Sequence, residues 1–214
     1  MYGNLSPQRA LVWRILHRDN LPWVLKHGLH SGNSHTRASN WTSIGHAELI
    51  ARRATHPVPI SPGGALGDYV PFYFTPFSVM LRNIQTGWAD TPRVDNDDIV
   101  ILVSSLLRLR ELGLRFLFTD RHAYSSLARY FDDLSSLDNI DWAILQRRDF
   151  RRDPEDPGKL ERYQAEALVY KHVPLDALLG VVCYSDLVRD AILSEMSTAA
   201  IQLPVYTRPN WYFQ

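Results

Sequence analysis

A glutamate at the start of an apolar segment is the residue of this sequence whose position best suits chemistry. Glu166 directly precedes Ala167–Tyr170, whose apolar and aromatic side chains predict a strand. The charged segment 146–163 leads into it. A carboxylate held on a strand, with a substrate-presenting loop before it, can stabilise a positive centre or accept a proton. By residue type alone, Glu166 could equally cap the strand or pair with Arg162.

The loop before Glu166 is rich in arginine. Its arginines are Arg147, Arg148, Arg151 and Arg152. Arginine forks bind phosphates in bidentate geometry and stack on unpaired bases, so these side chains favour a nucleic acid as ligand, with an acidic peptide as the other candidate. The alternative is a solvated surface balanced by nearby acids, which are Asp149, Asp153, Glu155 and Asp156. Arginine also outnumbers lysine throughout the chain, which codon bias in a GC-rich genome would explain equally well.

Composition indicates one globular domain over residues 1–214. Hydrophobic residues make up 45% and charged residues 21% of the chain, and the formal net charge is zero. A long-range field that draws the whole protein to nucleic acid is therefore not expected. The sequence has no apolar run of about 18 residues, which a membrane span needs. The lone Cys183 lies in an apolar run and the first residues do not resemble a secretory signal, so we expect a cytoplasmic protein with no membrane partner.

Other catalytic and cofactor motifs find little support. His27, His30 and His35 lie near one another but lack a carboxylate or thiolate at ligand spacing, so no metal is expected. The glycines of 63–67 precede an aromatic strand instead of a helix, which argues against a phosphate-binding glycine turn. No nucleophile elbow of the hydrolase type is present either.

The elements that must position these residues indicate an α+β protein. Strands are predicted at 11–17, 69–75, 99–103, 116–119, 167–170, 180–184 and 202–207. Helices are predicted at 47–54, 78–85, 105–112, 122–134, 140–147 and 186–196, with a further short helix that Asp19 or Asn20 caps and Gly28 ends. The polar segment 31–45 has little periodicity, which predicts a flap that becomes ordered around a ligand.

Four segments of the sequence resemble the DarT family, the toxin half of a bacterial toxin–antitoxin pair. They are Arg14–Pro22, Asp68–Pro76 with Met80 and Leu81, Phe118–His122 and Gln164–Val169. They occur in the family's order and extend over nearly the whole chain. Leu16 stands where the family usually has Thr, and Thr75 where it often has Ala. A hydroxyl contact to the cofactor is therefore expected to be lost or supplied elsewhere.

The resemblance implies a fold and an activity. The fold is that of an ADP-ribosyltransferase, in which a split β-sheet core with peripheral helices holds NAD⁺ in its cleft. The activity is transfer of ADP-ribose from NAD⁺ to a base of single-stranded DNA, thymidine being favoured, with release of nicotinamide. A macrodomain antitoxin is the partner that the same resemblance implies.

The resemblance also implies roles for individual residues. Glu166 and Arg53 form the catalytic pair, although the adjacent Arg52 fits the family pattern equally well. The residues expected to bind NAD⁺ are His17, Asn20, Leu21, Arg53 and Tyr73. His122 is expected on the side of the acceptor DNA, and the four arginines of the loop before Glu166 are expected to contact that single strand. Ordinary structural roles remain open for Tyr73 as a core aromatic, and for His17 and His122 as hydrogen-bonded corner residues.

The chemistry required of these residues is coherent. Cleavage of the bond between nicotinamide and ribose gives an oxocarbenium-like centre, which a carboxylate near the ribose stabilises. Glu166 is favoured as the base for an acceptor nitrogen that carries a proton, and Arg53 as an electrostatic positioner, because an ordinary arginine is a poor base. The alternatives are an enzyme of this fold that acts on guanosine, RNA or protein, or a silent NAD⁺ or nucleic-acid binding module. The intact Glu166 argues against silence.

Overall fold

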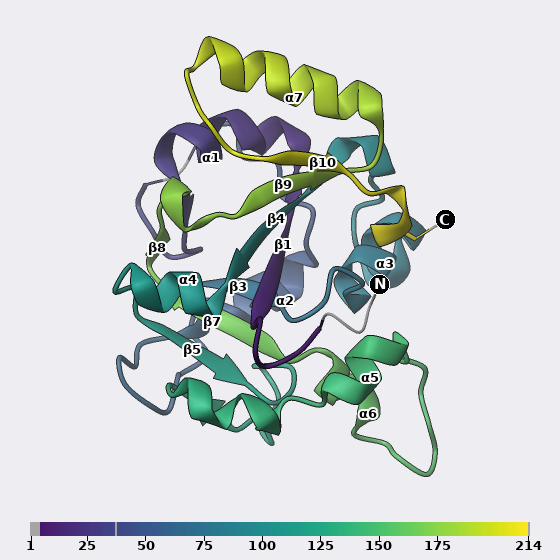
Figure 1. Ribbon diagram of the computed structural model, residues 1–214. Coiled ribbons are helices and arrows are strands. Elements are labelled where there is room, and N and C mark those ends of the chain that lie inside the picture. Colours follow the sequence, from purple (N-terminus) through teal and green to yellow (C-terminus); the bar gives the residue numbers. More distant parts are fainter. Residues whose placement is uncertain (1–4, 37, 214) are drawn as a thin grey trace.

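A mixed eight-stranded sheet forms the centre of the computed structural model, which describes residues 5–36 and 38–213 (Figure 1). The strand order is β10-β9-β4-β1-β3-β7-β5-β6. The strands are β1 (Leu11–His17), β3 (Tyr69–Tyr73), β4 (Ile99–Ser105), β5 (Phe116–Thr119), β6 (Tyr130–Phe131), β7 (Glu166–Tyr170), β9 (Gly180–Cys183) and β10 (Val205–Thr207). A second small sheet pairs β2 (Leu29–His30) with β8 (His172–Val173).

Helices surround this sheet, and α7 runs along the side formed by β9 and β10 (Figure 1). They are α1 (Leu21–His27), α2 (Ala47–Arg53), α3 (Val79–Thr86), α4 (Leu106–Glu111), α5 (Trp142–Arg147), α6 (Lys159–Tyr163) and α7 (Asp186–Thr198). Serine hydroxyls cap the N-termini of α3, α4 and α7 as N-cap oxygens do, and Gly28 ends α1 as predicted. Among the described residues no helix is both long and apolar enough to span a bilayer.

The sheet is split between β1 and β3. β1 pairs with β4 along its full length and β3 with β7 along its full length, whereas Trp13 and Tyr73 form the single register pair between β1 and β3. The carbonyl of Pro71 faces β1 and accepts a hydrogen bond of 3.1 Å from Arg14 Nη1. Proline has no N–H to donate toward the same side, so the ladder cannot continue past it. A side-chain bond from Arg14 stands in for the missing main-chain bonds.

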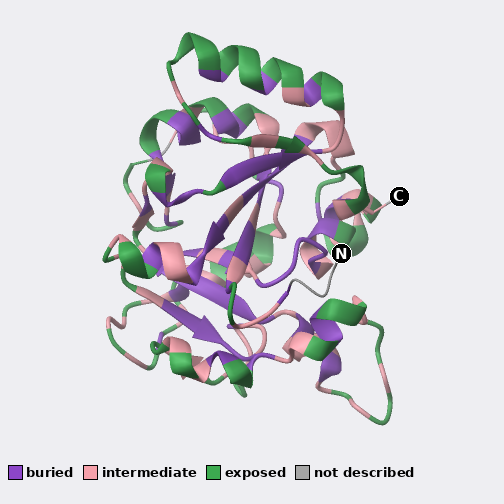
Figure 2. Cartoon of the chain, viewed as in Figure 1, coloured by how far each residue is buried: buried purple, intermediate pink, exposed green. Residues whose placement is uncertain are grey.

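The strands β4 and β7, which pair with β1 and β3 on the sides away from the split, are among the most deeply buried elements of the molecule (Figure 2). Ala167, Leu168 and Val169 of β7 are fully buried, as are Ile99–Leu102 of β4. Both faces of these strands are covered, which explains why they are continuous apolar runs in the sequence instead of alternating ones. The α+β fold with a split central sheet and peripheral helices is therefore confirmed.

Two expected elements differ. The helix predicted at 122–134 is wrong, because this segment forms turns followed by β6. The Asp120 carboxylate accepts hydrogen bonds from the Arg129 main-chain amide at 3.1 Å and Arg129 Nε at 2.8 Å, and the Tyr130 hydroxyl donates to the Ala123 carbonyl at 2.6 Å. These bonds fold the segment back on β5 and override its helical spacing. The last strand begins at Val205, three residues later than predicted.

Candidate active site

A buried ion pair lies at the floor of a cleft beside the split. Arg53 Nη1 donates to Glu166 Oε1 at 2.9 Å, and Arg53 Nη2 donates to Oε2 at 2.8 Å. The side chains of Arg53 and Glu166 are 12% and 3% exposed. Arg53 is the last residue of α2 and Glu166 the first of β7, so a helix end and a strand end hold the two groups in bidentate geometry. The Ala123 amide donates a third bond to Glu166 Oε1 at 3.0 Å.

These partners keep Glu166 ionised. Burial by itself raises the pKa of this carboxyl, but Arg53, His122 and the Ala123 amide outweigh burial, and the pKa lies below the ordinary value of 4.5. The same attraction to Glu166 outweighs burial at Arg53 and raises its pKa. Both groups are therefore charged at neutral pH.

Tyr73 and His122 face the ion pair. Tyr73 is directly opposite Glu166 in the β3–β7 register, so the two side chains share one face of the sheet. Burial, followed by the nearby Glu166 charge, raises the pKa of Tyr73 to about 12. His122 Nε2 lies 3.9 Å from Glu166 Oε1, and burial lowers the pKa of His122 despite that carboxylate. Tyr73 and His122 are therefore predominantly neutral at pH 7.

The cleft has a volume of about 780 Å³. Its floor and sides come from Arg14 of β1, Tyr73 of β3, Glu166, and residues of α2 and α3. The described part of the flap, 31–36 and 38–45, supplies most of one wall. Trp23 and Trp41 add aromatic surface, with their ring centroids 5.9 Å apart in an edge-to-face arrangement. A mostly apolar enclosure with a few convergent charges is typical of a site for a dinucleotide-sized ligand.

The geometry separates two arginines that are adjacent in the sequence. Arg53 points to Glu166, whereas Arg52 pairs with Glu48 on the surface of α2 and its side chain is 57% exposed. Both line the cleft. Only Arg53 can therefore act together with Glu166 in this arrangement.

Comparison with known proteins shows the family to which the chain belongs. The sequence model for the DarT family, described as ssDNA thymidine ADP-ribosyltransferase, matches residues 13–213. The chain belongs to the DarT family. It is 54% identical to a DNA ADP-ribosyl transferase of Escherichia coli O127:H6 over 211 residues, which are 99% of this chain and 97% of the relative.

Two solved structures of Thermus sp. 2.9 DarT are also similar. The one in complex with ADP-ribosylated ssDNA is 36% identical with a TM-score of 0.89, covering 97% of this chain and 98% of that one. The one in complex with NAD⁺ is 34% identical with a TM-score of 0.84, covering 97% of this chain and all of that one. The fold and the enzyme class predicted from the sequence are thus confirmed as those of DarT.

Three residues that the DarT resemblance assigned to NAD⁺ do not line the cleft. His17 ends β1, and its Nδ1 accepts from the Asp19 amide at 3.2 Å. Leu21 is buried in the core. The Asn20 side chain bonds both main-chain groups of Thr42, at 2.7 Å and 2.9 Å, instead of capping α1. Because Thr42 belongs to the flap, Asn20 anchors the wall of the cleft without lining the cleft itself.

The arginine loop between α5 and α6 also lies away from the cleft and extends outward from the body (Figure 1). Lys159, which is 8% exposed, donates to Asp149 and Asp153 at 3.1 Å and 3.3 Å. Arg162 pairs with Asp156 at 2.7 Å. The acids thus bind residues of α6 instead of the loop arginines, apart from a contact of 3.8 Å between Asp149 and Arg151. The Arg148 guanidinium lies over the Phe77 ring, 3.5 Å from its centroid, while Arg147, Arg151 and Arg152 are exposed.

Sequence reasoning missed several groups of this DarT cleft. Arg14 was part of a matching segment but received no role, and it lies at the split with its guanidinium in the cleft wall. The Ala123 amide, which binds Glu166, leaves no signature in a sequence because every residue except proline has such a group. Trp23 and Trp41 had a usable signal, since Trp23 directly follows the segment Arg14–Pro22 of the resemblance and Trp41 lies within the flap predicted at 31–45.

Proposed function

We propose that this DarT family member transfers ADP-ribose from NAD⁺ to thymine in single-stranded DNA and releases nicotinamide. The observation that carries the proposal is the bidentate pair of Arg53 and Glu166 at the floor of a cleft large enough for a dinucleotide. The Thermus relative, which has the same fold, is described in complexes with NAD⁺ and with ADP-ribosylated ssDNA. Family, fold and charge pattern all support this single reaction.

Glu166 is proposed to stabilise the transition state. When the bond between C1′ and the nicotinamide nitrogen breaks, its electrons leave with nicotinamide, and positive charge develops on the ribose. An ionised carboxylate in a buried site stabilises that charge more strongly than water does, because it needs no reorientation. The lowered pKa of Glu166 supplies the anion throughout the neutral range.

The acceptor nitrogen must lose a proton as it bonds to C1′, and Glu166 is the proposed base. A carboxylate with a lowered pKa is a weak base. It suffices here because the nitrogen becomes positively charged, and its proton more acidic, as the new bond forms. Arg53 stays protonated and fixes both carboxylate oxygens, so its role is positioning.

The acceptor strand is proposed to run along the arginine loop, with His122 on the acceptor side of the cleft. Exposed Arg147 and Arg152 form no ion pair with the acids around them among the described residues, and Arg151 has only the 3.8 Å contact with Asp149. This exposure favours contacts to phosphates or unpaired bases. Arg148 already stacks on Phe77, so it is expected to contribute less to DNA binding than the other three arginines. His122 lines the cleft beside Glu166, where the target base would enter.

NAD⁺ is proposed to lie between Tyr73 and the flap, whose described residues 31–36 and 38–45 form one wall. Asn20 would act on this site by holding Thr42 in place. The side chains of His17 and Leu21 do not line the cleft. They would act on NAD⁺ binding indirectly, by fixing the corner where β1 meets α1. A macrodomain partner in the cytoplasm extends the proposal and rests on the family resemblance alone.

Nucleoside mass spectrometry tests the reaction and its alternatives together. The protein is incubated with NAD⁺ in separate reactions, each of which contains one acceptor: single-stranded DNA, RNA of the same sequence or bulk protein. The expected result is nicotinamide release that depends on DNA, with the ADP-ribose adduct on thymidine. An adduct on guanosine, on RNA or on protein would contradict the proposed acceptor, and the absence of NAD⁺ consumption with every acceptor would indicate a silent binding module.

A further inference from the structure

Arg14 is a charged residue of the cleft that the mechanism above does not use and that, unlike Arg52 and Glu48, has no ion-pair partner among the described residues. It lies on β1 beside the split, and its Nη1 is bound to the Pro71 carbonyl at 3.1 Å. Its Nε is buried and has no hydrogen-bond partner among the described residues. A buried donor without a partner costs stability, so its persistence in a cleft wall points to a ligand that the cleft accepts.

The charges of the cleft lining leave Arg14 in excess. The arginines that line it are Arg14, Arg52 and Arg53, and the carboxylates are Glu48 and Glu166. Glu48 pairs with Arg52 and Glu166 pairs with Arg53. Within residues 5–36 and 38–213, no carboxylate forms an ion pair with Arg14. The cleft wall thus holds one guanidinium without a counter-ion in contact.

The electrostatic surroundings of Arg14 favour an incoming anion. Burial lowers the pKa of Arg14, while Tyr73 raises it, Arg53 lowers it and Glu166 raises it again, so the balance remains on the lowered side. A guanidinium in this setting stays protonated but is poorly solvated. An anionic ligand that entered the cleft would replace the lost water and relieve the repulsion from Arg53.

We propose that Arg14 binds the diphosphate of NAD⁺ and is the anion-binding residue of the co-substrate site. The inference rests on the proposed function and deepens it. The diphosphate is joined to the ribose whose C1′ must approach Glu166, so it lies within one sugar of the reacting carbon. Arg14 lies near enough to Glu166 and Arg53 for both charges to act on its pKa. A DNA phosphate belongs to a strand that follows the exposed loop instead.

The test compares ligands with and without a diphosphate. Binding of ADP-ribose and of adenosine to the full chain is measured by calorimetry for wild type, Arg14→Gln and Arg14→Lys. Loss of a charge-assisted hydrogen bond predicts that Arg14→Gln weakens ADP-ribose binding about tenfold to a hundredfold. Adenosine binding changes by less than about twofold, since this ligand makes no contact that depends on the charge. Arg14→Lys, which keeps the charge but not the fork, falls between wild type and Arg14→Gln for ADP-ribose.

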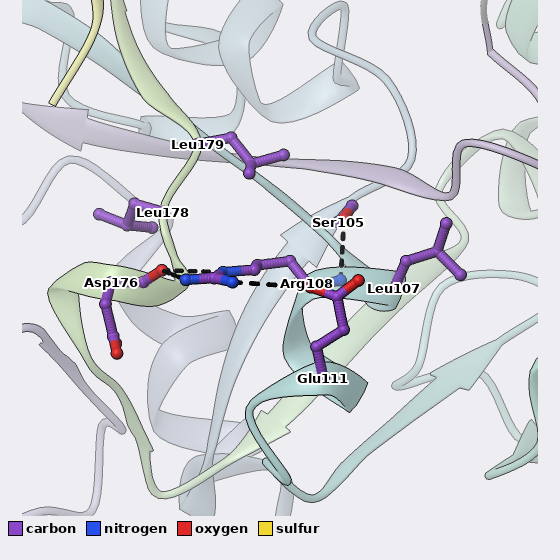
Figure 3. Close-up of a pocket in the computed structure, with 7 residues that line it drawn as sticks. All are labelled: Ser105, Leu107, Arg108, Glu111, Asp176, Leu178 and Leu179. Atoms are coloured by element: carbon purple, nitrogen blue, oxygen red, sulfur yellow. Dashed lines mark hydrogen bonds and ion pairs between the residues drawn. The ribbon is translucent and has the colours of Figure 1, made fainter.

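Arg108 offers a matched control in the shallow pocket of Figure 3. Its Nε and Nη2 donate to the Asp176 carbonyl, both at 3.0 Å, so it also ties an arginine to a main-chain oxygen, but outside the cleft. Arg108→Gln is expected to leave ADP-ribose affinity unchanged.

Several results would overturn the inference. They are wild-type ADP-ribose affinity in Arg14→Gln, an equal loss for ADP-ribose and adenosine as a purely structural role predicts, and a loss of oligonucleotide affinity alone. If Arg14→Gln does not fold, Arg14→Lys replaces it in the test. A loss of affinity for ADP-ribose that exceeds the loss for adenosine supports the inference, and an equal loss for both ligands overturns it. Failure of the wild-type protein to bind ADP-ribose would instead contradict the proposed use of NAD⁺.

Discussion

The cleft floor and the arginine loop use the same types of charge in opposite ways. At the floor, one arginine and one carboxylate are locked together by two hydrogen bonds and are nearly excluded from solvent. In the loop, the carboxylates are bound by Lys159 and Arg162 of α6, so most of the arginines remain exposed. A fixed pair suits a reacting centre that must not rearrange, whereas exposed cations on an anchored loop suit a long, flexible polyanion.

The difference shows that ion pairing serves two separate purposes in this molecule. The Arg53–Glu166 pair sets the ionisation of the proposed catalytic carboxylate. The pairs of Lys159 and Arg162 set the shape of a loop and neutralise acids that would otherwise repel a phosphate backbone. Substitutions in the two regions should therefore change different measurable quantities.

Glu166→Gln should have the largest effect, because it removes the charge at the floor while keeping the size of the side chain. Transfer to an oligonucleotide is expected to fall by about a hundredfold to a thousandfold. The loss of the partner for buried Arg53 is expected to cost about 3 kcal/mol of the free energy of unfolding. Labelled oligonucleotide is quantified under single-turnover conditions, with urea unfolding measured alongside.

Glu48→Gln is the matched control, since Glu48 also lines the cleft and also pairs with an arginine of α2. Its labelling rate should stay within about twofold of wild type, as for most surface pairs. Near-wild-type transfer by folded Glu166→Gln would remove the catalytic assignment.

Arg53→Gln should have the next largest effect, and it tests how Arg53 controls the ionisation of Glu166. Arg53 is the strongest of the influences that lower the pKa of Glu166, so its removal raises that pKa and moves the acid limb of the pH–rate profile to higher pH. In wild type, the lowered folded-state pKa gives stability that is present above the ordinary value of 4.5 and is lost as pH falls through the folded-state pKa. In Arg53→Gln this acid-labile part of the stability should vanish.

The adjacent Arg52→Gln supplies the comparison. Arg52 is exposed and touches Glu48 alone among the described carboxylates, so the pH–rate profile should not move. An equal shift in both variants would show that position along α2, not contact with Glu166, controls the effect.

Double substitution in the loop, Arg151→Ala with Arg152→Ala, should have a moderate effect of another kind. If both contact phosphates, the logarithm of single-strand affinity should depend less steeply on the logarithm of salt concentration, by about 1.4. ADP-ribose affinity should not change, because the loop lies away from the cleft. The exposed Arg110→Ala combined with Arg189→Ala controls for net charge. Equal slopes in all three proteins would place the DNA path elsewhere.

The smallest expected effect concerns the flap. Saturating NAD⁺ should slow proteolysis between residues 31 and 45 several-fold, because a bound ligand shifts the population toward the closed wall. Asn20→Ala, which unties Thr42, should speed cutting when NAD⁺ is absent. Cutting that is indifferent to both changes would show that this segment is rigid or uninvolved.

How much the sequence reveals depends on how local the cause is. β1 and β4 begin at the predicted residues and Glu166 lies at the edge of the predicted strand, because apolar runs and caps are local signals. The segment after β5 was predicted as a helix because its turns depend on Asp120, a residue just outside the pattern that binds Arg129. A hydrogen bond between residues nine positions apart leaves no periodic pattern in the sequence, so the pattern could not predict it.

The site was predictable in type but not in detail. Arg52 and Arg53 differ by about 100° in direction around a helix of 3.6 residues per turn, and only the tertiary fold decides which one meets Glu166. Arg14 and Ile15 of β1 line the cleft, whereas His17 at the end of the strand does not, so the tertiary fold decides which residues of this matching segment reach the cleft. The resemblance assigned a role to His17 and none to Arg14, and of the two only Arg14 lines the cleft.

Pro71 has a consequence for the thermodynamics of ligand entry. A gap between two strands of ordinary sequence could close by forming main-chain bonds, and a ligand would then have to break those bonds before binding. Proline at this place removes the donor, and Arg14 occupies the acceptor, so the empty protein gains nothing from closure. The β1–β3 side of the cavity is therefore preorganised, so ligand binding costs little reorganisation free energy on that side, in contrast to the flap wall.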